Sequence, residues 1–100
     1  MTAQGHPRAI FRRAIERRNL LVAETIAREL GTISLDEALA LVCLVAERSS
    51  PQRLDAYGRR WLARLATEHE LTLAELDLAI TALRALPSPR AQDALHALIR

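Results

Sequence analysis

Apolar residues recur along this chain at the spacing of α-helices. From Pro7, the residues Ile10, Phe11, Ala14 and Ile15 form one apolar stripe, which is the pattern of a helix with one buried face. A different stretch, 38–46, is apolar without interruption, and a helix with no polar face is normally buried between others. The pattern predicts an all-α fold of five or six helices, at about 7–17, 20–30, 35–48, 51–69, 73–86 and 89–99.

Polar residues, prolines and one glycine mark the ends of these helices. Ser34 with Glu37, and Thr72 with Glu75, have the spacing of a capping box, in which each side chain bonds a free backbone amide of the first turn. Gly31 is placed to end the second helix, because glycine enters the left-handed region without steric cost. Two serine–proline pairs, Ser50-Pro51 and Ser88-Pro89, are further helix starts, and Arg18-Asn19 is a short break at which asparagine can cap or turn left-handed.

The helix starts are themselves periodic. One offset separates Ser34 from Thr72, Glu37 from Glu75 and Ser50-Pro51 from Ser88-Pro89. Such periodicity indicates an internal repeat of stacked helical hairpins. The alternative is two unrelated helix pairs that share common cap chemistry. With 100 residues, the chain is expected to form one domain of antiparallel hairpins at about 7–30, 35–69 and 73–99, preceded by a flexible segment 1–6 and arranged as a short solenoid or an orthogonal bundle.

The first hairpin, residues 9–30, is similar to the helical pairs of tetratricopeptide repeats. The stretch from Ala14 to Asn19, followed by Leu21-Val22-Ala23 and Ala27, resembles the turn and the small-residue contacts between two such helices. Arg18 stands where that family usually has glycine, and no Trp or Tyr occupies the first helix. The resemblance implies close antiparallel packing of the two helices.

The amino-acid composition limits the kinds of reaction and binding site that this chain can provide. All fourteen basic residues are arginine, so reactions that depend on lysine have no residue to perform them. The single cysteine, Cys43, lies inside the apolar stretch and is expected to be buried and inert; it also fits a reducing, cytoplasmic location. The longest apolar run is far shorter than the roughly 20 residues of a membrane helix. No catalytic or metal-binding motif is present, so neither an enzyme, a cofactor nor a small-molecule substrate is expected.

Our first functional hypothesis is a small helical protein-interaction module or homo-oligomeric scaffold. Helices 35–48 and 73–86 are apolar over more of their circumference than a chain of this size easily hides, which favours a protein partner or a homodimer. Aromatic and arginine side chains dominate interface hot spots, so we predict partner contacts at Tyr57, Trp61 and Arg64. Core packing is the alternative for the two aromatic residues. Arg12 and Arg13 are predicted to contact an acidic partner.

The second hypothesis is a small arginine-rich nucleic-acid-binding protein. The first eighteen residues hold five arginines against the single Glu16, so positive charge is concentrated in the first helix. A basic helix face can neutralise phosphates, although a solvated face is the alternative, and Asp55 can reduce the available charge by pairing with Arg59. The arginines assigned to nucleic acid under this hypothesis are Arg8, Arg12, Arg13, Arg17, Arg53, Arg59 and Arg60.

Overall fold

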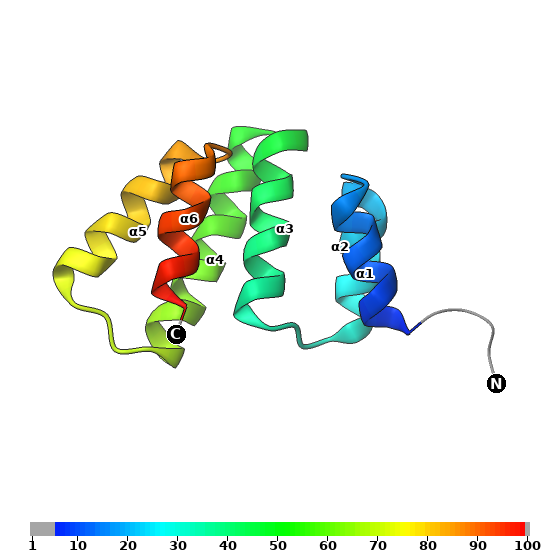
Figure 1. Ribbon diagram of the computed structural model, residues 1–100, viewed down its shortest axis with the longest axis horizontal. Helices are drawn as coiled ribbons and strands as arrows, with labels where there is room; N and C mark the ends of the chain where they lie inside the picture. The colour runs from blue at the N-terminus through cyan, green and yellow to red at the C-terminus, as the bar shows by residue number, and fades with distance from the viewer. Residues whose placement is uncertain (1–5, 100) are drawn as a thin grey trace.

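Six helices connected by short turns make up the structure, a computed structural model that describes residues 6–99 (Figure 1). No strand occurs within that range. The all-α prediction is therefore confirmed; the expected flexible segment 1–6 lies, except for His6, outside the described residues. The helices are α1 (Pro7–Glu16), α2 (Leu20–Leu30), α3 (Leu35–Arg48), α4 (Pro51–Glu68), α5 (Leu73–Ala85) and α6 (Pro89–Leu98).

The predicted capping boxes are both present. The Ser34 hydroxyl accepts from the Glu37 amide at 3.1 Å while the Glu37 carboxylate accepts from the Ser34 amide at 2.8 Å, and the same two bonds join Thr72 and Glu75. One predicted cap is wrong. The Ser88 side chain makes no capping hydrogen bond, and α6 begins with Pro89, whose missing amide leaves one donor fewer to satisfy.

The breaks on either side of α2 use two left-handed residues. Gly31 has φ +77° and ends α2 as predicted. At the first break, Asn19 is the N-cap of α2 and accepts from the Val22 amide at 3.2 Å. The left-handed residue there is not Asn19 but Arg18, at φ +56°, the position that glycine usually occupies in the tetratricopeptide pattern. Its guanidinium pairs with Glu47 at 2.9 Å, which ties the strained turn to the end of α3.

The helices form three antiparallel hairpins, and the last two close into a bundle. α3 packs against α4 and α6, while α5 packs against α4 and α6, so the four helices form a ring. In a solenoid, equivalent helices of successive hairpins would lie side by side. Over residues 35–98 neither α3 with α5 nor α4 with α6 makes such a contact. Of the two arrangements that the sequence left open, this part of the chain adopts the bundle.

Helix α3 has apolar neighbours on both sides. Leu39 and Val42 belong to the core of the four-helix bundle, while Leu41 and Leu44 pack with Phe11 and the rest of the first hairpin. The first hairpin, α1 with α2, therefore lies against the outer side of α3 (Figure 1). The uninterrupted apolar stretch of the sequence is explained by this position, because α3 needs no polar face.

Trp61 lies in the bundle core rather than on the surface. Its side chain is 2% exposed, and its indole Nε1 donates to the Leu35 carbonyl at 3.1 Å. The expectation that Trp61 contacts a partner is thereby corrected, since the residue belongs to one buried core with apolar residues of α3, α5 and α6. Of the two alternatives for this residue, the structure selects core packing.

We expect Trp61→Phe to lower the free energy of unfolding by about 1 to 2 kcal/mol, because the variant loses a buried hydrogen bond and leaves a small void. Urea denaturation monitored by circular dichroism measures the change. Leu21→Ala, at a residue that is 75% exposed, is the control and should stay within about 0.5 kcal/mol of the parent. A neutral Trp61→Phe would contradict the placement of the indole.

Candidate functional site

One of the predicted nucleic-acid arginines, Arg8, is used to dock the first hairpin. Its guanidinium forms an ion pair with Glu37 and also donates to the Thr32 carbonyl at 3.3 Å. The hydrogen bond from Arg8 is the main reason why the pKa of Glu37 is lowered. Glu37 therefore serves two purposes: it closes the capping box of α3 and holds the start of α1.

Arg53 and Tyr57 meet a carboxylate that the sequence analysis missed. Glu24 of α2 is only 8% exposed, and it accepts hydrogen bonds from both the Arg53 guanidinium and the Tyr57 hydroxyl of α4. Burial and the nearby Glu24 raise the pKa of Tyr57, which keeps its hydroxyl a donor. The guanidinium of Arg60 lies over the Tyr57 ring, 4.9 Å from its centroid. We call the cluster Glu24, Arg53 and Tyr57 the α2–α4 latch.

The remaining α4 arginines also have partners in the chain. Arg59 pairs with Asp55 at 2.8 Å, as its spacing predicted. Arg64 pairs with Glu68 at 2.8 Å and donates to the Ile33 carbonyl, also at 2.8 Å, in the turn before α3. Tyr57, Trp61 and Arg64 therefore do not form one exposed contact patch: the first is half-buried in the latch, the second lies in the core, and the third holds a turn.

Three of the predicted site arginines have neither an ion pair nor a stacking partner among residues 6–99. Arg12, Arg13 and Arg17 are exposed, and none forms an ion pair with a residue in the part of the chain that the structure describes. Arg13 and Arg17 border a shallow pocket of about 180 Å³, whose other lining residues are Ile10, Ala14, Asn19 and Val22. Of the seven arginines assigned to nucleic acid, three are thus free to bind an external anion.

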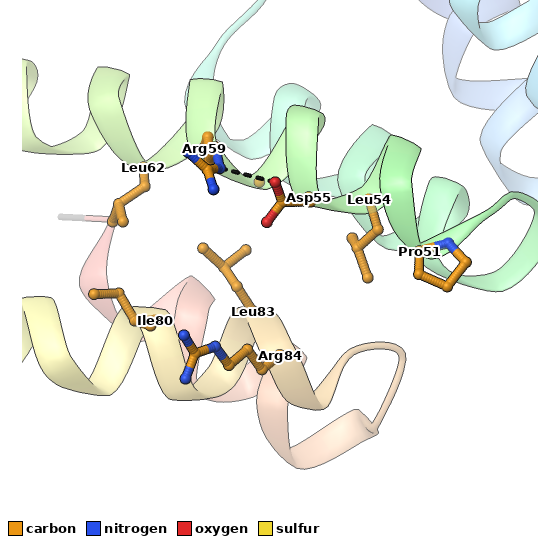
Figure 2. A pocket seen from close by; sticks show the side chains of 9 residues that line it. Pro51, Leu54, Asp55, Arg59, Leu62, Ile80, Leu83 and Arg84 are labelled. Atoms are coloured by element: carbon orange, nitrogen blue, oxygen red, sulfur yellow. Dashed lines mark hydrogen bonds and ion pairs between the residues drawn. The ribbon is translucent and has the colours of Figure 1, made fainter.

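A groove of about 390 Å³, which the sequence analysis did not find, lies between α4 and α5 (Figure 2). Aliphatic side chains from the two helices face one another across it, and the charged groups Asp55, Arg59 and Arg84 stand among them. Gly58 lies in its α4 wall, buried against the Leu83 methyl groups. We call this hollow the α4–α5 groove; the residues that line it are Pro51, Leu54, Asp55, Gly58, Arg59, Leu62, Ile80, Leu83 and Arg84.

The α4–α5 groove is lined by more positive than negative side chains. Asp55 and Arg59 neutralise one another on α4. Arg84 on α5 is exposed and has no ion pair with any residue between 6 and 99. A ligand in the groove would thus meet an apolar surface with one unbalanced positive charge, which favours an apolar ligand with a carboxylate.

Reactive groups are not gathered at this groove. Cys43, the one thiol, lies in the α3 core, where burial and then the charge of Glu47 raise its pKa to about 11, so at neutral pH it stays a thiol. His96 lies beside Asp36, with its Nδ1 3.4 Å from Oδ1, and this contact joins α6 to α3. The groove therefore offers binding chemistry, through aliphatic contacts and a guanidinium.

Removing the carboxylate of the latch should destabilise the protein. We expect Glu24→Ala to lower the free energy of unfolding by about 1 to 3 kcal/mol, since Arg53 and Tyr57 lose their shared acceptor. The control is Glu29→Ala, an exposed glutamate on the same helix, which should have little effect. In a double-mutant cycle with Tyr57→Phe, the two losses should not add, because both variants break the same bond. Additive losses would contradict the direct hydrogen bond.

The ion pair of Glu37 makes stability depend on pH. Because folding lowers the pKa of Glu37 from its ordinary 4.5, the stabilisation is fully present above that value and is lost as the pH falls through the lower folded value. We expect urea midpoints to decrease below about pH 4.5, and to decrease less in Arg8→Ala, which removes the main cause of the shift. An equal decrease in both proteins would show that other carboxylates are responsible.

Among residues 6–99 no group of three or more His, Cys, Asp or Glu side chains is placed to hold a metal ion. None of the described helices combines the length and the apolar character that crossing a membrane requires.

The helical hairpin implied by the tetratricopeptide resemblance is present as α1 and α2. Comparisons with models of known protein families, with curated proteins and with solved structures gave no match.

Proposed function

We propose that this protein is a non-catalytic protein-interaction module whose binding site is the α4–α5 groove. The observation that supports the proposal is the groove itself, an open apolar hollow of about 390 Å³ with the unpaired Arg84 at its side. Apolar surface left open in a small protein is typical of an interaction site. The proposed ligand is an amphipathic helix from a protein partner.

A helix suits the groove because the groove runs between two neighbouring helices. An amphipathic helix binds such a groove by inserting aliphatic side chains from one of its faces, spaced at i, i+3, i+4 and i+7. Leu62 from α4 and Ile80 and Leu83 from α5 provide aliphatic partners for them. The Arg84 guanidinium then favours ligands with an acidic residue beside the apolar face, since a charge-assisted hydrogen bond adds orientation as well as affinity.

The groove is a better candidate than the arginine surfaces. Arg8, Arg53 and Arg59 are neutralised by Glu37, Glu24 and Asp55. Arg60 is stacked on Tyr57. Nucleic-acid binding would then depend on Arg12, Arg13 and Arg17, and each phosphate contact that is lost lowers the affinity at physiological salt. Binding in the groove does not require an arginine to leave its partner within the chain.

A panel of random helical peptides displayed on phage tests the proposal. Peptides selected on the intact protein should share an apolar stripe and an acidic residue, and Ile80→Glu, which places a carboxylate in the groove, should weaken their binding at least about tenfold. The matched control is Leu78→Glu. Leu78 is also an apolar residue of α5 and is 46% exposed, but it does not line the groove.

The two variants distinguish a loss of binding in the groove from a general effect of a new carboxylate on α5. Circular dichroism should show the same helix content in both, since each residue has access to solvent. Equal weakening by Ile80→Glu and Leu78→Glu, or selected peptides that lack an apolar stripe, would overturn the groove as the binding site.

A further inference from the structure

We infer that the occupant of the α4–α5 groove is a second copy of this chain, whose α5 packs antiparallel against α5 of the first around a two-fold axis. This inference rests on the proposed function and names the partner of the same site. A two-fold contact uses the same surface on both copies, so that surface must be complementary to itself. The charges and apolar residues along α5 meet that requirement.

Four residues of α5 form one stripe that includes two lining residues of the groove. Leu73, Asp77, Ile80 and Arg84 follow one another at spacings of four, three and four residues, which places them on one side of a helix. Ile80 and Arg84 line the groove. Leu73 is 85% exposed, and it continues the apolar surface toward the start of the helix. The stripe is thus an accessible amphipathic face of the kind that the groove would bind.

The stripe is self-complementary when two copies run in opposite directions. Asp77 and Arg84 lie at equal distances on either side of the point between Ile80 and Thr81. If the two-fold axis passes through that point, Asp77 of each copy lies opposite Arg84 of the other. Two equivalent ion pairs then flank a central contact between the Ile80 side chains.

Asp77 and Arg84 are both exposed, and neither forms an ion pair within residues 6–99. Seven residues of helix separate them by roughly 10 Å along the axis, so they are poorly placed to pair with each other. The other charges of the groove, Asp55 and Arg59, are already paired and do not oppose the approach of a second copy.

The test is a charge exchange measured by sedimentation equilibrium at low ionic strength, where the ion pairs are least screened. The parent chain should show a concentration-dependent dimer. Asp77→Arg and Arg84→Asp each place like charges opposite one another, and each should raise the dimer dissociation constant about tenfold or more. The double variant restores both pairs with reversed polarity and should return to within about threefold of the parent.

The matched controls are Glu29→Arg and Arg28→Asp, which make the same charge changes at exposed positions of α2 and should leave the dissociation constant unchanged. A parent chain that stays monomeric at every concentration would overturn the inference, as would a dimer that the α5 exchanges do not affect. If helical peptides from the display panel still bind the groove of such a monomer, the proposed function stands and only the identity of the partner is wrong.

Discussion

The architecture depends on the burial of α3 on both of its sides. A helix with the unbroken apolar stretch 38–46 has no stable place at the edge of a bundle, because one side would face water. The four-helix ring of α3 to α6 covers one side through Leu39 and Val42, and the first hairpin covers the other, where Leu41 meets Phe11. The hairpin of α1 and α2 is thus required by the sequence of α3.

Two of the arginines serve the same requirement. Apolar contacts hold the hairpin against α3, but they do not fix its orientation. Its orientation is fixed by polar contacts at its edges. Arg8 reaches Glu37 at one of these contacts, and Arg53 and Tyr57 reach the buried Glu24 at another. A paired carboxylate in such a position is costly to break and fixes one arrangement. Arg84 in the groove and Arg12, Arg13 and Arg17 of the first hairpin are among the described residues without an ion pair, so their charges are available to partners.

Local features of the fold could be predicted from the sequence, and contacts between distant segments could not. The helix starts at Ser34, Ser50 and Thr72 depend on residues within one turn, so their spacing is sufficient. Trp61 and Glu24 differ from these helix starts, because the burial of each depends on which helix packs over it. The aromatic character of Trp61 suggested a surface contact. Glu24 was overlooked because it was one acidic residue on a helix. The α4–α5 groove results from how two helices diverge, which no single segment encodes. The lone acid between Ala23 and Ile26 was the one available signal for the latch.

The double use of Glu37 has a consequence for cooperativity. Its carboxylate accepts from the Ser34 amide within the first turn of α3 and from the guanidinium of Arg8 on α1. Fraying of the α3 terminus and release of the first hairpin therefore break bonds to the same oxygen atom, Oε1 of Glu37, so neither event leaves the other unaffected. A hairpin and a bundle that could otherwise open separately are joined into one cooperative unit, and amide protons at the start of α3 should exchange at the rate at which α1 departs.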